Sequence, residues 1–422
     1  MNGPLHVDLV YTNPRSGPKD IAADFDLTRA SAAIDVFKWS KPPDAPARAS
    51  IRLTLQGDRP LAITDFRFEA SDLSGDGDGR FDPRGKLVYI GFRHMTLGRT
   101  RLDNVALDFS GEQINARIAN GEFDAEPFIG KSTLASHSAA EEGKPTRPFS
   151  IVTDHLTRVI IGPDREIDDI RFSFDYDGLH WQKLQAAGTP RGGKPMTISW
   201  LPAADGMHHL SVVAEDAGTA LKILGVIDSV VGGKLTITGT APDNDPKRPI
   251  KGRAEVTEYR LVNQSALVRL LTIATFTGVL DAMTGQGFQM YRFEADFTKT
   301  GGRIDVPLAR TWGPSLGLTA TGFFDYGTDQ IDLKGTVVPA YALNSILGQI
   351  PIVGFLLTGG KGSGVFAAVY TATGKLSEPT ISVNPLSALA PGFLRGVFGL
   401  FSSGDQGPAA LPPNFGQTGS GK

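Results

Sequence analysis

The sequence predicts a mostly β protein of the α+β class, built on antiparallel sheet with a few apolar helices toward the C-terminus. Apolar and polar residues alternate with a period of two over most of residues 1–260, the spacing of strands with one apolar face. Turn sequences rich in Gly and Asp recur at intervals of about 8–12 residues. The charged fraction is 21% for the chain, yet only four of the 67 residues from Gly335 to Phe401 are charged.

Runs in which every second residue is apolar predict the strands. Such runs contain Ile51, Leu53 and Leu55; Val105, Leu107 and Phe109; Ile114, Ala116 and Ile118; Met196, Ile198 and Trp200; Leu210, Val212 and Ala214; and Tyr291, Phe293, Ala295 and Phe297. Between them we expect turns at 74–77, 110–112 and 177–178. Short strands joined by tight turns form antiparallel sheets with one apolar and one polar face.

Two helices are predicted before the apolar C-terminal region. Apolar residues at helical spacing cover 216–231, with Asp216 as the N-cap and Gly232-Gly233 as the end. A second helix is expected over Ser265–Thr284, apolar on most sides and ended by Gly285.

The weakly charged C-terminal region predicts further helices. Residues Tyr341–Thr358 form two short apolar helices broken at Pro351, and Pro391–Phe401 form another. The domain organisation is then a β segment (1–135), a polar loop or linker (136–149), a β segment with the helix at 216–231 (150–260), an apolar α/β region (261–401) and a disordered tail (402–422).

Composition and motifs argue against several functions. The 45 acidic and 42 basic side chains leave no excess of positive charge for nucleic acid, and the absence of Cys excludes disulfides and thiolate chemistry. The seven His form no metal-ligand spacing, and no GxSxG motif is present. The glycine-rich stretches 359–364 and 416–422 lack the flanking strand and helix that a phosphate loop needs. We expect neither catalysis nor a cofactor.

One acidic stretch has a pattern related to calcium loops. Residues Asp72–Asp82 (DLSGDGDGRFD) match an EF-hand at the first, third, fifth and sixth positions, but Pro83 stands where the bidentate Glu is required. A solvated β-turn is the favoured interpretation, with a weak calcium alternative at Asp72, Asp76 and Asp78.

The C-terminal region carries a pattern of structural residues. It comprises Pro339-Ala340-Tyr341, Asn344, Leu347-Gly348, Pro351, Gly354, the 359–364 turn, Tyr370, Gly374, Pro379 and Asn384-Pro385-Leu386. With these residues, 334–401 resemble the C-terminal region of AsmA-like proteins, in particular the YhdP/TamB-type bridge-like lipid transport proteins. Residues 26–43, 216–239 and 261–287 are similar to that family as well.

The resemblance implies a long, curved antiparallel sheet folded into a hydrophobic groove. It also implies an inner-membrane anchor, a path across the Gram-negative periplasm to the outer membrane, and phospholipid as cargo. The chain opens directly into strand-like alternation and has neither a signal peptide nor 18 consecutive apolar residues. We therefore expect a fragment, the membrane-distal portion of such a bridge.

Two sets of apolar residues are candidates for function. The lipid-groove candidates are Val105, Leu107, Phe109, Met196, Ile198, Trp200, Leu210, Val212, Tyr291, Phe293 and Phe297. The candidates for membrane or partner contact lie in the C-terminal helices: Ile352, Val353, Phe355, Leu356, Leu357, Phe393, Leu394, Val397, Phe398 and Phe401. Periodicity alone leaves open whether the strand faces line a trough or a closed core, and whether the helices plug the sheet or contact a membrane.

An alternative function stands beside lipid transport. A non-enzymatic scaffold or assembly factor of the cell envelope would bind a protein partner through its sheet edge or its apolar helices.

Overall fold

The structure is a computed structural model that describes residues 2–34, 39–128, 147–262, 287–339, 368–376 and 378–384. Over these residues the chain forms 24 strands and one helix, which confirms the predicted mostly β class. The chain divides into two compact units, an N-terminal unit (Met1–Val256 and Thr298–Gly302) and a C-terminal unit (Thr257–Phe297 and Arg303–Lys422).

The first ten strands are β1 (His6–Thr12), β2 (Lys19–Asp26), β3 (Ala32–Ile34), β4 (Trp39–Lys41), β5 (Arg48–Gln56), β6 (Arg59–Glu69), β7 (Leu73–Phe81), β8 (Leu87–Leu97), β9 (Thr100–Asp108) and β10 (Ile114–Asp124). They are followed by β11 (Phe149–Thr153), β12 (Leu156–Gly162), β13 (Arg165–Tyr176), β14 (Trp181–Pro190), β15 (Met196–Pro202), β16 (Met207–Ala214), α1 (Ala217–Ile223), β17 (Val230–Pro242) and β18 (Ile250–Leu261). The last strands are β19 (Phe288–Thr300), β20 (Arg303–Trp312), β21 (Leu316–Asp325), β22 (Gln330–Pro339), β23 (Ala368–Lys375) and β24 (Glu378–Asn384).

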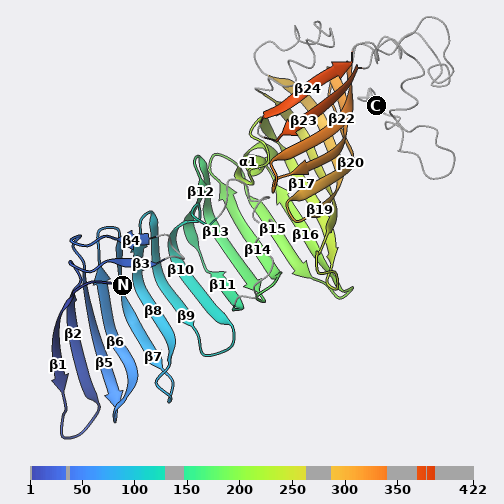
Figure 1. The fold of residues 1–422 in the computed structure, drawn as a ribbon. Coiled ribbons are helices and arrows are strands. Elements are labelled where there is room, and N and C mark those ends of the chain that lie inside the picture. Colours follow the sequence, from blue (N-terminus) through green and yellow to red (C-terminus); the bar gives the residue numbers. More distant parts are fainter. Residues whose placement is uncertain are drawn as a thin grey trace, which may run out of the picture. The chain divides into compact units, whose positions relative to one another are not determined.

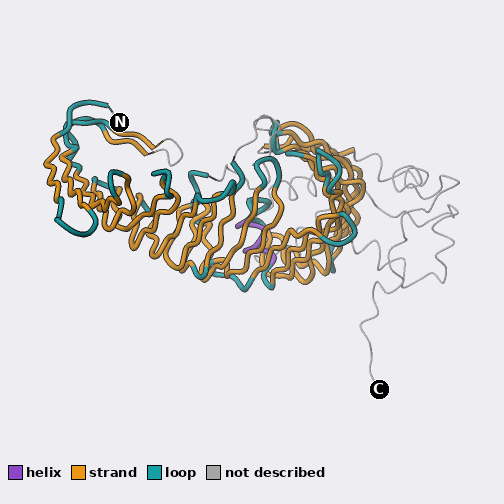
Figure 2. Tube along the Cα trace, turned by 90° about the horizontal axis from the view of Figure 1, so that it is seen from below, coloured by secondary structure: helices purple, strands orange, loops and turns teal. Residues whose placement is uncertain are grey.

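The N-terminal unit is a succession of paired strands, which lie side by side in Figure 1. β1 pairs with β2, β2 with β5, and each strand from β5 to β10 with the next, all antiparallel. The strands from β13 to β17 continue in the same way. Seen in the turned view of Figure 2, they form a single layer.

One junction departs from this pattern. β10 pairs in parallel with β11 and with β12, and these two strands both pair antiparallel with β13. Residues 129–146, which include most of the predicted polar loop, lie outside the described residues. At the end of that loop the Arg147 guanidinium donates hydrogen bonds to the carbonyl oxygens of Phe109 (3.2 Å), Gly111 (2.7 Å) and Glu112 (2.8 Å).

The short β3–β4 hairpin stands apart from the main sheet and is held by two polar side chains. The Trp39 indole N–H donates to Asp72 Oδ1 over 2.8 Å, which ties the hairpin to the turn before β7. The buried Lys41 ammonium donates to the carbonyl oxygens of Thr28 (3.0 Å), Ala30 (2.6 Å) and Pro42 (3.0 Å). Three acceptors match the three ammonium protons, so this charge is hydrogen-bonded although it is buried.

Helix α1 begins as the sequence predicts and ends earlier. The Asp216 side chain accepts a hydrogen bond from Thr219 N (3.1 Å), the predicted N-cap. The predicted extension to Val231 is wrong, because Gly225 adopts a positive φ of 67° and its N–H bonds Lys222 O while Val226 N–H bonds Leu221 O. These two bonds form a Schellman motif, which terminates a helix.

The turn predicted at 74–77 and favoured over 72–82 is also wrong, and the stretch does not have the loop conformation of an EF-hand. Leu73–Phe81 is strand β7, paired with β6 on one side and β8 on the other. Its alternating glycines are strand residues on one face, and Ser74, Asp76, Asp78 and Arg80 occupy the other. The turns predicted at 110–112 and 177–178 are confirmed as the connections β9–β10 and β13–β14.

In the C-terminal unit β20 to β24 pair antiparallel in chain order, and β19 pairs with β20. Tyr370 lies across Gly335 of the neighbouring strand, and its hydroxyl donates to Thr319 O over 2.8 Å. Burial raises the pKa of Tyr370 to about 12. The helices predicted at 265–284, 341–358 and 391–401, and the tail, lie outside the described residues.

Candidate functional site

The N-terminal unit carries one apolar row that runs across the sheet from β1 to β17. Residues that are direct partners in paired strands point to the same face. Following the pairing from β1 to β17 therefore gives a set of neighbours on one face, which we call the apolar row. It consists of Tyr11, Ile21, Leu53, Ile63, Gly79, Ile90, Leu107, Ala116, Ile151, Phe174, Leu184, Trp200, Leu210 and Gly239.

No charged or strongly polar side chain interrupts this row. At a strand separation of about 4.8 Å, thirteen steps correspond to roughly 60 Å measured along the sheet. Parallel to it runs a second apolar line through Leu9, Ala23, Ile51, Phe66, Gly77, Phe92, Val105 and Ile118. The two lines together make a continuous apolar face.

The exposure of the row distinguishes it from an ordinary core. Leu53, Ile90 and Leu184 are half-buried, and at the β1 end Tyr11 is 49% exposed. A face covered by a second layer would bury such side chains almost completely. In the described part of this unit only α1 and the β3–β4 hairpin lie outside the main sheet, so most of the apolar face has no layer over it.

One end of the face is closed. Helix α1 packs against β13, β14 and β17, and at the same ends of the strands Met196, Ala214 and Leu235 are at most 5% exposed. These three residues are direct partners in β15, β16 and β17. The helix thus converts the edge of the apolar face into a small core, and the apolar row lies clear of it.

Glycines of β7 allow aromatic rings to lie flat on the face. A Cβ at Gly77 would come within 2.8 Å of the Phe66 ring, and one at Gly75 within 2.6 Å of the Phe68 ring. Phe92 meets Phe66 edge-on with ring centroids 5.4 Å apart. The three phenylalanines cover the glycine strand, where backbone would otherwise be exposed.

A second aromatic group occupies the β11–β15 part of the face. Phe149, Phe174, Tyr176 and Trp181 have ring centroids 3.9–6.5 Å apart. The Trp200 indole N–H donates to Trp181 O over 3.2 Å. Aromatic residues of this kind bury a large area while their polar atoms remain hydrogen-bonded.

The opposite face is polar and dominated by ion pairs. Arg93 bridges Asp65 and Asp76, each at 2.6 Å. Burial acts to raise the pKa of Asp76, but hydrogen bonds from Arg93 and His94 outweigh it and hold that pKa below its ordinary value. Asp76 is therefore engaged by cations, and the described residues contain no group of three or more acidic or histidine side chains suited to a metal ion.

A buried histidine lies where the apolar face reaches the far ends of β14–β16. His208 is 2% exposed and stacks on Trp200, with centroids 5.0 Å apart. Its Nδ1 bonds a carboxylate oxygen of Asp243, and its Nε2 lies 3.0 Å from Gln182 O. Both ring nitrogens thus lie within hydrogen-bonding distance of an oxygen, and the arrangement links three chain segments.

The predicted groove residues fall into three groups. Leu107, Trp200 and Leu210 belong to the apolar row, and Val105, Ile198 and Val212 flank it on the same face. Met196 lies under the α1 end, and Phe109 is half-buried just after β9. Tyr291, Phe293 and Phe297 belong to the C-terminal unit.

Tyr291 differs from the other predicted residues of its strand. In β19, Phe288 and Met290 are buried, and so is Ala295, so the buried positions change from even to odd numbers along the strand. Tyr291 is 52% exposed as a result. The membrane or partner candidates at 352–357 and 393–401 lie outside the described residues.

Sequence reasoning missed Phe66, Phe68, Phe92, Phe149, Phe174 and Leu184, which complete the face. A usable signal was present for some of them, because Phe66 and Phe68 alternate with charged residues. For β7 there was none, since its face-forming residues are glycines.

No described helix is long and apolar enough to cross a membrane. No protein-family model matches the chain, and no curated protein matches it either.

Proposed function

We propose that this chain is the distal portion of a periplasm-spanning bridge that carries phospholipid between the inner and outer membranes along a hydrophobic groove. The observation that supports it best is the unbroken apolar row across β1–β17, most of whose members are half-buried, without a covering layer in the described residues. The resemblance to AsmA-like proteins points the same way.

The physical requirement of such a task is a reduced cost of desorption. A phospholipid that leaves a bilayer exposes about 30 methylene groups, each worth about 0.8 kcal/mol, so roughly 25 kcal/mol opposes its transfer to water. An apolar wall that accompanies the acyl chains removes part of this cost while the head group stays hydrated. No nucleophile, acid–base pair or cofactor is needed for this function.

Location and partners follow as parts of the same proposal. The chain resides in the periplasm of a Gram-negative bacterium, in a longer protein anchored in the inner membrane. Its apolar C-terminal segments contact a membrane or an envelope protein.

The alternative of an envelope scaffold is favoured by one specific observation. All seven residues of β1 are exposed, with Leu9 at 61% and Val10 at 62%, and β1 pairs only with β2 among the described strands. A long edge strand with apolar side chains and no Lys or Pro is able to accept a strand from a partner.

Lipid mass spectrometry of the detergent-free purified chain, beside a mock purification, tests the main proposal. Phospholipid is expected to co-purify with the wild type. Replacing Leu184→Glu places a charge in the apolar row, whereas Gln185→Glu places the same charge on the next residue of β14, which is exposed on the polar face.

The two variants give a matched comparison. Leu184→Glu is expected to lose most of the bound lipid, and Trp200→Glu likewise, while Gln185→Glu retains it, with folding checked by circular dichroism. A folded wild type free of lipid would contradict the groove proposal. A stoichiometric envelope protein captured in its place, and lost on Leu9→Lys in β1, would favour the scaffold.

A further inference from the structure

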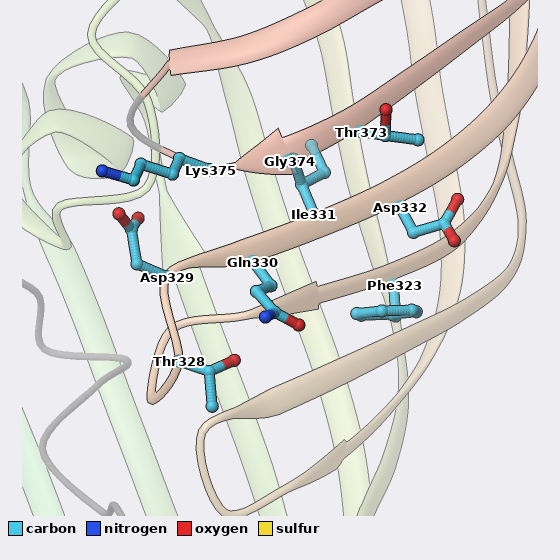
Figure 3. A pocket seen from close by; sticks show the side chains of 9 residues that line it. All are labelled: Phe323, Thr328, Asp329, Gln330, Ile331, Asp332, Thr373, Gly374 and Lys375. Carbon is cyan, nitrogen blue, oxygen red and sulfur yellow. The ribbon is translucent and has the colours of Figure 1, made fainter.

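The C-terminal unit contains a cavity of about 530 Å³ on β21, β22 and β23. We call it the Phe323 dish. Its lining side chains are drawn in Figure 3: Phe323, Thr328, Asp329, Gln330, Ile331, Asp332, Thr373, Gly374 and Lys375. Its volume falls within the range of small-molecule sites, about 300–1,000 Å³.

The Phe323 ring forms one wall of the dish, and a cation of the neighbouring strand β20 packs against it. Phe323, Asp332 and Thr373 are direct partners across three strands, so their side chains share a face. The Arg303 guanidinium lies 3.6 Å from the centroid of the Phe323 ring. Arg303 is itself fixed by Asp305, with contacts of 2.9 and 2.8 Å. Because Arg303 and Asp305 come from β20, they cover the ring on the side away from β22.

Four polar groups of the remaining wall have no hydrogen-bond partner in the part of the chain that the structure describes. Within the described residues, the side chains of Gln330, Asp332 and Thr373 make no hydrogen bond, and neither does the ammonium of Lys375. Figure 3 shows Asp332 above the Phe323 ring and Gln330 beside it, with Thr328 and Asp329 on the β21–β22 turn. Donors and acceptors are therefore both available around one aromatic face.

We propose that the Phe323 dish binds a short neutral saccharide. A pyranose presents an apolar C–H face, which suits the electron-rich face of an aromatic ring. Its hydroxyl groups both donate and accept, and so match the amide of Gln330, the carboxylate of Asp332 and the hydroxyl of Thr373.

The charges disfavour the other ligands that stack on aromatic rings. Two carboxylates, Asp329 and Asp332, line the dish against the single ammonium of Lys375. A nucleotide or a phosphorylated head group would meet repulsion there, since phosphate sites collect Arg, Lys or backbone N–H groups. The saccharide site is independent of the proposed lipid groove, which rests on residues of the N-terminal unit.

Saturation-transfer NMR on the full chain tests the saccharide site. The probes are maltose, cellobiose, lactose and di-N-acetylchitobiose, each titrated separately, with phosphoethanolamine and glycerol phosphate as charged comparisons. Saturation transfer is expected for at least one disaccharide and for neither phosphate compound.

Three variants locate the binding. Phe323→Ala removes the ring and Asp332→Asn removes the carboxylate at an exposed strand position, and each is expected to weaken saccharide binding at least tenfold. Thr321→Ala, on the same face but outside the dish, leaves it unchanged. Absence of transfer from all four disaccharides to the folded wild type overturns the proposal. So does transfer that both Phe323→Ala and Asp332→Asn leave intact.

Discussion

At the scale of single residues, the apolar face depends on glycine as much as on large side chains. Gly75, Gly77 and Gly79 of β7 occupy positions where the neighbouring strands place Phe68, Phe66 and Ile63. A ring lying over a glycine shields the backbone on both sides of it. The C-terminal unit uses the same arrangement, with Tyr370 lying over Gly335. Such ring–glycine pairs shield the backbone within a single layer of sheet, without a second layer packed on top.

The first prediction concerns Gly77→Ala. The added Cβ would lie 1.9 Å from Gly91 O and 2.8 Å from the Phe66 ring, so backbone as well as side chain must shift. We expect a loss of about 1–3 kcal/mol in the free energy of unfolding, measured by urea denaturation. Gly111→Ala is the control, because its nearest atom is Gln113 N at 3.9 Å and it has no positive φ. Equal stability of the two variants would contradict the proposed close packing.

At the scale of elements, a line of alternating charges spans the β10–β12 junction on the polar face. Arg101, Glu122, Arg158 and Asp168 are successive partners in β9, β10, β12 and β13. Glu122 lies 3.7 Å from Arg101 and 3.6 Å from Arg158. Arg158 also approaches Glu166 at 3.7 Å, and Arg191 of the β14–β15 connection contacts Glu166 and Asp168.

Reversing one charge in this line provides the second prediction. Glu122→Lys places three cations side by side, and cross-strand like charges are destabilising. We expect the melting temperature in low salt to fall by several degrees. Raising sodium chloride to 0.5 M is expected to recover part of the loss, because these side chains are partly exposed and screened. Asn115→Lys, elsewhere on β10, serves as the control; a salt-independent loss would indicate a packing defect instead.

Some helices and strands could be predicted from the sequence, and others could not. The alternation at 196–200 and 210–214 predicts β15 and β16, and Asp216 predicts the start of α1. The end of α1 was missed because the apolar spacing continues beyond Gly225, where the positive φ stops the helix. β7 was missed because its glycine-aspartate repeat has the composition of a turn, and its own residues do not reveal the pairing with β6 and β8.

Strand pairing was the other feature that the sequence could not predict. Periodicity assigns Leu107 and Trp200 to apolar faces, but only the register places them in the same row. The parallel step at β10 was not predicted at all, since alternating residues look the same in either direction. The candidates at 352–357 and 393–401 stay predictions.

At the scale of the whole molecule, each strand of the N-terminal unit contacts little beyond its two neighbours. Stability in such an arrangement is a sum of local terms and varies along the sheet. β1 has every residue exposed, whereas β12 has five of its seven residues buried. We therefore expect local stability to be lowest at β1 and high at β12.

Hydrogen exchange measures this gradient and gives the third prediction. Amides of His6–Thr12 are expected to exchange at least 100-fold faster than those of Val159–Ile161, because opening β1 breaks pairing on one side only. Intermediate protection is expected over β5–β8. Uniform protection from β1 to β13 would show that the unit unfolds as one cooperative body.

The parallel step between β10 and the β11–β12 pair has a consequence for how the molecule is assembled. A hairpin joins only antiparallel neighbours, so no hairpin connects β10 with β11 or β12 across this parallel seam. The parallel seam therefore separates two sets of antiparallel strands, and each set is formed by one continuous stretch of the chain. Separately expressed pieces ending at 128 and starting at 147 would have complementary edges, which makes this the natural place for a split reporter or for domain recombination.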